Sequence, residues 1–168
     1  MTDPREKLSE TQVRDAGLAD WRQILGRLKA RFRTGDFRTG LALVNKIGAA
    51  AEVANHHPDV QLTYSDVIVT LASHDVRGIT SRDLDLARQI SSHAAGLGIG
   101  SDVAGLTQLE LGLDTALGSR LAPFYAALLG GTVQDGEPVD PSGQVPTVWW
   151  QEPGDDDETL ALPEQPFE

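Results

Sequence analysis

Residues 64–74 have the sequence YSDVIVTLASH, which is the clearest strand pattern in the chain. Its side chains alternate between two faces, one with Val67, Val69 and Leu71 and the other with Ile68, Thr70 and Ala72. Such alternation, in a run rich in β-branched residues, is typical of a strand. We therefore expect a strand that ends at His74.

The segment before this strand predicts a short helix and a hairpin. Ser9 and Gln12 have the spacing of a capping box, and Gly17 ends the helix that they begin. Apolar residues lie among basic or polar ones on both sides of Gly26-Arg27, which predicts two strands joined by a tight turn; they are Trp21, Ile24, Leu28, Ala30 and Phe32.

Two longer helices flank the strand in the sequence. The first has Asp36 as its N-cap and continues to about Asn55. Its apolar residues recur at three- and four-residue steps, so we expect one core-facing stripe of Phe37, Leu41, Val44, Ile47, Gly48 and Ala51. The second begins at Thr80, with Asp83 completing a capping box, and ends in the glycines of residues 96–100.

Composition and charge limit the classes of function. The chain has 168 residues, 40% of them hydrophobic, and no cysteine. Its apolar runs are far shorter than the roughly 18 to 20 residues that span a bilayer, and residues 1–7 are too polar for a secretory signal. We therefore expect a cytoplasmic protein that does not bind membranes.

The net charge of -11 is concentrated in the second half of the chain. Residues 1–99 contain 13 basic and 12 acidic side chains, whereas residues 100–168 contain 1 and 13. An acidic surface repels phosphate backbones, so nucleic-acid binding is not expected.

We expect four regions in the chain. Residues 1–97 form an α+β domain, residues 98–105 a glycine-containing linker and residues 106–151 a smaller βαββ unit. Residues 152–168 are acidic and contain three prolines without an amphipathic period, which predicts a disordered tail.

Three of the four histidines lie close together in the sequence, at His56, His57 and His74. Pro58 stops the preceding helix, so that the adjacent pair projects from a rigid exit loop. His74 ends the strand. Imidazoles titrate near neutral pH, and such a group of three is typical of a proton-transfer site.

The spacing around these histidines resembles the pterin-4a-carbinolamine dehydratase family over about residues 8–95. The matching pattern is Glu52-x3-His56-His57-Pro58-x5-Tyr64-x9-His74-x8-Asp83. The resemblance implies an antiparallel four-stranded sheet with helices on one face, and a fourth strand near residues 60–63. It also implies a homodimer or homotetramer that recycles the pterin cofactor of aromatic amino acid hydroxylases.

In that family the imidazoles remove water from a 4a-hydroxytetrahydropterin without a metal or another cofactor. The resemblance assigns His57 as the leading proton donor, and His56 and His74 as groups that bind the pterin and shuttle protons. Asp83 and Glu52 would support the imidazoles. Pro58 and Tyr64 would contact the substrate.

These residues also have structural interpretations. Asp83 fits a helix cap, Glu52 a solvated helix side chain and Tyr64 a packing residue. His93 has no matching position and is expected to be structural. Three imidazoles suit zinc, but adjacent histidines rarely point at one metal, so no metal is expected.

The smaller unit resembles a half module of the glyoxalase-like, vicinal oxygen chelate superfamily. The resemblance rests on residues 121–131, 139–143 and 146–151. That superfamily combines two modules around a metal held by His and Glu, yet no histidine follows His93 here. Either the natural chain is longer, or the half module pairs between subunits. The Trp149-Trp150 pair is expected to pack within a sheet or an interface, although it could stack a flat ligand.

Two further functions stay open on the sequence. The first domain could be a non-catalytic oligomerisation or binding module. It could also be a dehydratase-like enzyme for another small cyclic substrate.

Overall fold

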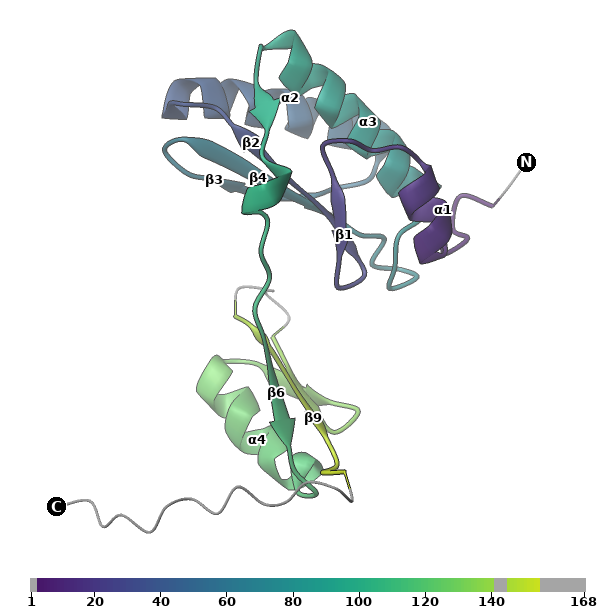
Figure 1. Ribbon diagram of the computed structural model, residues 1–168, viewed down its shortest axis with the longest axis vertical. Helices are drawn as coiled ribbons and strands as arrows, with labels where there is room; N and C mark the ends of the chain where they lie inside the picture. Colours follow the sequence, from purple (N-terminus) through teal and green to yellow (C-terminus); the bar gives the residue numbers. More distant parts are fainter. Residues whose placement is uncertain (1–2, 141–144, 155–168) are drawn as a thin grey trace, which may run out of the picture. The chain divides into compact units, whose positions relative to one another are not determined.

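The computed structural model describes residues 3–140 and 145–154. The chain divides into two compact units, Met1–Thr107 and Gln108–Glu168. Figure 1 shows a sheet with helices in the first unit and a smaller sheet and helix in the second. No helix in the described ranges combines the length and the apolar character that crossing a membrane requires.

The first unit is built on one antiparallel sheet. Its main strands lie in the order β1-β2-β4-β3, and β5 pairs with the end of β2. Their bounds are β1 (Arg22–Ile24), β2 (Arg27–Arg33), β3 (Asp59–Leu62), β4 (Asp66–Leu71) and β5 (Gly100–Ser101). The expected four-stranded antiparallel sheet is confirmed, and β5 adds a short fifth strand at one edge.

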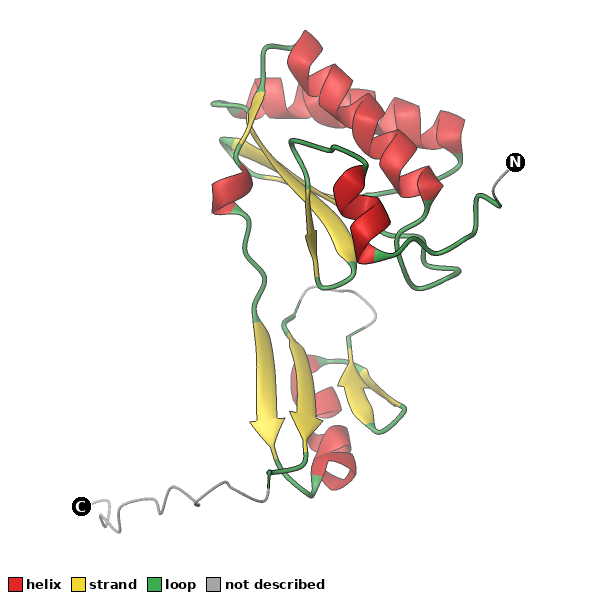
Figure 2. Cartoon of the chain, turned by 45° about the vertical axis from the view of Figure 1, so that its right-hand side comes forward, coloured by secondary structure: helices red, strands yellow, loops and turns green. Residues whose placement is uncertain are grey.

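Three helices accompany this sheet, and α2 and α3 lie side by side over one of its faces (Figures 1 and 2). The helices are α1 (Glu10–Asp15), α2 (Phe37–Ala54) and α3 (Ser81–Gly96). Both expected capping boxes form, one at Ser9 with Gln12 and the other at Thr80 with Asp83. Asp36 caps α2 through the backbone N–H of Thr39. The helix starts predicted from the sequence are therefore confirmed.

The hairpin turn lies one residue earlier than expected. Leu25 and Gly26, not Gly26 and Arg27, occupy the turn, with φ angles of 49° and 73°. Two successive positive φ angles are characteristic of the type I′ turn, whose twist matches that of the strands. Glycine adopts this backbone without steric cost.

The core lies between the sheet and the helices. Val67, Val69 and Leu71 of β4 are 0% exposed, as their alternation predicted. Phe32 and Leu28 of β2 are 1% exposed. Each such side chain contributes about 1.5–3 kcal/mol through burial of apolar surface, so this face of the sheet holds the unit together.

The prediction of which α2 residues face the core is wrong in part. Phe37 and Leu41 are 49% and 45% exposed, whereas Leu43 and Ile47 are at most 1% exposed. A Cβ on Gly40 would lie 2.6 Å from Leu62 Cδ1, so glycine lets this turn of the helix approach the sheet. Because of this close approach, the helix turns the face with Gly40, Leu43 and Ile47 toward the core. The face with Phe37 and Leu41 is left at the surface.

Residues 98–105, expected as a linker, contain β5 and the short 3₁₀ helix η1 (Val103–Gly105). The Asp102 N–H donates to the Arg31 carbonyl at 2.7 Å. The Asp102 carboxylate accepts from Arg33 Nη2 at 2.7 Å and lies 3.6 Å from Arg31 Nη1. These contacts attach the segment to β2 and make it part of the first unit.

The second unit contains β6 (Glu110–Asp114), α4 (Gly118–Leu129), β7 (Thr132–Gln134), β8 (Glu137–Val139) and β9 (Thr147–Gln151). β6 and β9 pair in parallel, and β7 and β8 form a hairpin. The expected βαββ string lacked β8. The Asp135-Gly136 pair, with φ angles of 51° and 83°, forms the turn between β7 and β8 and was the sequence signal for it.

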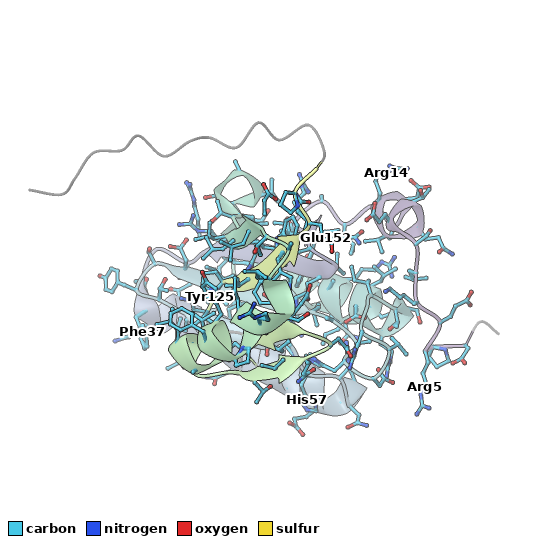
Figure 3. The ribbon with its side chains drawn as sticks, turned by 90° about the horizontal axis from the view of Figure 1, so that it is seen from below. Arg5, Arg14, Phe37, His57, Tyr125 and Glu152 are labelled. Carbon is cyan, nitrogen blue, oxygen red and sulfur yellow. The ribbon has the colours of Figure 1, made fainter. Side chains whose placement is uncertain are left out.

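Trp150 packs within the second unit, as the packing interpretation expected. Its ring centroid lies 6.2 Å from that of Tyr125, and its indole is in close contact with Gly118. Figure 3 labels Tyr125 on α4. Of the expected tail, residues 155–168 lie outside the described residues.

Candidate active site

The end of α2 fixes the position of the adjacent histidines. Asn55 adopts the left-handed conformation at φ 46°, and the His56 N–H donates to the Ala51 carbonyl at 3.1 Å. This is the hydrogen-bond pattern of a Schellman cap, in which asparagine is the usual alternative to glycine. The chain turns out of the helix directly before the two imidazoles.

His56 is buried and paired with an acidic side chain. It is 8% exposed, and its Nε2 atom lies 2.7 Å from Asp83 Oδ1. Asp83 itself is 0% exposed. A carboxylate accepts hydrogen bonds, so Nε2 is the ring nitrogen that carries a proton and donates. The second ring nitrogen of His56, Nδ1, is left for other contacts.

The other oxygen of Asp83 accepts hydrogen bonds from two further residues. Ser73 Oγ donates to Asp83 Oδ2 at 2.7 Å, and the Thr80 N–H donates to it at 2.8 Å. The Thr80 hydroxyl lies 3.2 Å from the same oxygen and 2.9 Å from Ser73 Oγ. Asp83 is thus a helix cap and the partner of His56 at once, so its two expected roles are not alternatives.

His57 lies at the surface with Glu52 as its partner. His57 Nε2 is 3.2 Å from Glu52 Oε1, and the two side chains are 56% and 80% exposed. Figure 3 labels His57 among the solvent-facing side chains. A pair this exposed contributes about 0–1 kcal/mol to stability. Its effect is to orient the imidazole, while water retains access to the ring.

His74 lies in the turn that follows β4. Ser73 and Gly78 form an isolated bridge that closes this turn, and His74 is exposed between Ser73 and Asp75. The Asp75 carboxylate accepts from Arg82 Nη2 at 2.7 Å, and this hydrogen bond lowers the pKa of Asp75. Both neighbours of His74 are therefore tied to the start of α3.

The sheet register places the histidine pair and His74 near the same end of β4. Asp59, two residues after His57, pairs with Thr70 close to the end of β4. Pro58 lies between them and is half-buried. Asp83, which bonds to both residues, links His56 to Ser73. The segments that carry the three imidazoles thus meet at one end of the sheet.

Tyr64, an expected substrate contact, and His93, expected to be structural, both lie away from this end of the sheet. Tyr64 is 74% exposed and precedes the first residue of β4, at the opposite end of that strand from His74. His93 is half-buried in the last turn of α3. Within residues 3–140 and 145–154, no three histidine or acidic side chains lie so as to hold a metal ion.

Ser73 is the site residue that sequence reasoning missed. It is 1% exposed and bonds to Asp83. The sequence signal was its position in the alternation, because Ser73 lies two residues after Leu71 and so continues the buried series of Val67, Val69 and Leu71. A hydroxyl at a core-facing position needs a buried hydrogen-bond partner, and Asp83 provides it.

Comparisons with known proteins identify the family of the first unit. Residues 6–93 match the family model described as pterin 4 alpha carbinolamine dehydratase. A Thermosynechococcus vestitus protein named "putative pterin-4-alpha-carbinolamine dehydratase" is 42% identical over 91 residues, which cover 53% of this chain and 96% of the relative. A Nocardia farcinica protein of the same name is 38% identical over 91 residues, with 53% and 96% covered.

A solved structure is similar to about half of the chain. It is the crystal structure of a transcriptional coactivator/pterin dehydratase from Brucella melitensis, with a TM-score of 0.51 and 29% sequence identity. The similarity covers 53% of this chain and 99% of that one.

Proposed function

Because the chain belongs to the pterin 4 alpha carbinolamine dehydratase family, we propose that it removes water from 4a-hydroxytetrahydrobiopterin to give quinonoid dihydropterin. The reaction would recycle the pterin cofactor of aromatic amino acid hydroxylases. The buried His56–Asp83 pair, beside the solvent-accessible His57, is the observation that carries this proposal.

The chemistry needs one proton delivered and one removed. A proton is added to the 4a-hydroxyl oxygen, the C4a–O bond breaks, and water leaves. The N5 proton is lost from the ring, so the products are quinonoid dihydropterin and water. A positioned acid or base contributes roughly 100- to 10,000-fold to such a step.

The three imidazoles would share these tasks. We assign His57 as the leading donor to the hydroxyl, since its ring is accessible to a ligand and is oriented by Glu52. His56 and His74 would bind the pterin and shuttle protons, with Nδ1 as the nitrogen that His56 offers. Asp83 and Glu52 support the rings, and Pro58 stiffens the loop between the pair and β3.

Ultraviolet decay of enzymically generated 4a-hydroxytetrahydrobiopterin tests the proposal. The dehydration also proceeds unaided, so a blank without protein sets the baseline. We expect the wild type to accelerate the decay and His57→Ala to lose roughly 100-fold of that acceleration. His93→Ala, the matched control, should behave as the wild type. Equal decay with and without the wild-type protein would reject the enzymatic function.

A homo-oligomer is proposed on the apolar surface of α2. Phe37 and Leu41, one helical turn apart, are 49% and 45% exposed, and Figure 3 labels Phe37. Exposed apolar side chains on one face of an element commonly mark an interface. Sedimentation of the wild type and of the double variant Phe37→Ser, Leu41→Ser tests this. We expect smaller species for the variant, whereas a monomeric wild type would reject the assembly.

A non-catalytic assembly or binding module is the second candidate function. The similar Brucella melitensis protein is described as a transcriptional coactivator as well as a pterin dehydratase. The second unit, proposed as a glyoxalase-like half module that pairs between subunits, exposes Leu111, Phe124 and Leu128 by 46%, 62% and 65%. Oligomers that form without any acceleration of dehydration would favour this candidate.

A further inference from the structure

We propose that Ser73 is a positioning residue of the candidate active site, whose hydroxyl couples the turn carrying His74 to the His56–Asp83 pair. The inference rests on the proposed function and extends it to a residue outside the histidine pattern. Ser73 does not itself act on the substrate. Its effect passes through the carboxylate that holds His56.

The hydrogen bonds form one continuous path. Ser73 Oγ donates to Asp83 Oδ2 at 2.7 Å, and His56 Nε2 lies 2.7 Å from Asp83 Oδ1. All three residues are at most 8% exposed. Hydrogen bonds to a carboxylate in such a dry environment are stronger than those between neutral groups at the surface. The path therefore restricts the carboxylate, and through it the imidazole.

The same serine fixes the beginning of the His74 turn. The Ser73 N–H donates to the Gly78 carbonyl at 2.8 Å, while the Ser73 side chain is held by Asp83. His74 is the next residue in the chain. A shift of Ser73 consequently moves His74 and Asp83 together, which makes the serine a link between two of the imidazoles.

The path also determines which nitrogen His56 offers to a ligand. Asp83 Oδ1 accepts the hydrogen bond from Nε2, so Nδ1 is the ring nitrogen that can exchange a proton with a ligand. Ser73 and the Thr80 N–H occupy Asp83 Oδ2 and keep Oδ1 directed at His56. Without the serine hydroxyl, the carboxylate loses one of the contacts that set its rotation.

A purely structural role would have a different signature. The Ser73–Asp83 bond also stabilises the start of α3, so its loss lowers the midpoint of thermal unfolding in either case. Only a positioning role changes the turnover of the folded protein and the environment of two histidine rings. The decisive readouts are therefore kcat and the ring ¹⁵N signals, measured below the unfolding transition.

The test compares Ser73→Ala with Ser91→Ala in the full chain. Ser91 Oγ accepts from Trp21 Nε1 at 3.0 Å and provides a matched side-chain hydrogen bond outside the site. We expect Ser73→Ala to lower kcat about ten-fold with a smaller change in KM. It should also shift the ring ¹⁵N signals of His56 and His74 but not of His93. Ser91→Ala should change neither quantity.

Wild-type kcat and wild-type ring signals in Ser73→Ala would overturn the inference. So would an equal fall of kcat in Ser91→Ala, because the effect would then not be specific to the site. If Ser73→Ala does not fold, Ser73→Cys keeps the volume with a weaker donor. It should change kcat and the ring signals in the same direction, and the absence of any change would overturn the inference.

Failure of the proposed function has a separate outcome. If the wild-type chain does not accelerate dehydration, the enzymatic function fails, and the ring signals alone then decide the role of Ser73. Coupled shifts of His56 and His74 in Ser73→Ala would still support the link. Unchanged signals would overturn it.

Discussion

Replacement of Asp83 by asparagine should reverse the hydrogen-bonding direction of His56 while leaving the fold intact. The Thr80 N–H can only donate, so the amide oxygen of the Asp83→Asn side chain must stay where Asp83 Oδ2 lies, 2.8 Å away. The amide NH₂ then takes the place of Oδ1, opposite His56 Nε2. To accept from it, the ring must move its proton from Nε2 to Nδ1.

The stability change follows from the same contacts. Asp83→Asn removes the charge from the hydrogen bonds to His56, Ser73 and Thr80, at a cost of about 1 kcal/mol each. The lower desolvation cost of a neutral group offsets part of this loss. We expect a decrease of about 1–3 kcal/mol in the free energy of unfolding, against the roughly 5–15 kcal/mol typical of a domain.

Urea unfolding and dehydration kinetics measure the two effects separately. The urea midpoint should fall with an unchanged m-value, which reports a folded state of the same compactness. Because Nδ1 of His56 would then carry the ring proton and could no longer accept one from the pterin, kcat should fall roughly 100-fold. An Asp83→Asn protein with wild-type kcat and wild-type stability would refute the role given to the His56–Asp83 pair.

Three further predictions concern other parts of the first unit. Hydrogen bonds from arginines hold the pKa values of Asp66 and Asp102 below their ordinary range. The two carboxylates therefore stabilise the fold above about pH 4, and this stabilisation is lost as the pH falls through the lowered values. The unfolding free energy of Asp102→Asn should depend less on pH in this acid range than that of the wild type, and an unchanged profile would contradict this. Glu52→Gln should change the unfolding free energy by less than about 1 kcal/mol and kcat by only a few-fold; a loss as large as that of Asp83→Asn would assign Glu52 a larger part. A chain ending at Thr107 retains β5 and should unfold cooperatively on heating, whereas a non-cooperative transition would show that the first unit needs the second.

The sequence predicted those elements whose signals are local. The alternation around Val67 and the two capping boxes depend on neighbouring side chains only, and each appears in the structure. The turn at Leu25-Gly26 was displaced by one residue, since glycine can occupy either central position of a type I′ turn.

The errors concern contacts between distant residues. The stripes of α2 through Phe37 and through Gly40 have the same period, and only the approach of Leu62 to Gly40 selects one of them. The segment expected as a linker joins the sheet because Asp102 meets two arginines of β2. Neither contact has a signal in the local pattern.

The candidate site was predicted by its residue types more completely than by its connections. His56, His57, His74, Asp83 and Glu52 all stood out in the sequence, but which acid meets which imidazole did not. The structure pairs Asp83 with His56 and Glu52 with His57. Tyr64 was grouped with them by spacing alone, and spacing cannot show that β4 separates it from His74.

The most direct test of the central claim uses the four histidines of the chain as probes. A stable reduced pterin, such as 7,8-dihydrobiopterin, is titrated into protein labelled with ¹⁵N in its histidine rings. If one ligand lies among the three imidazoles, the signals of His56, His57 and His74 shift together with a single Kd, and that of His93 does not move. Shifts confined to one ring, or equal shifts of all four, would contradict a shared pterin site.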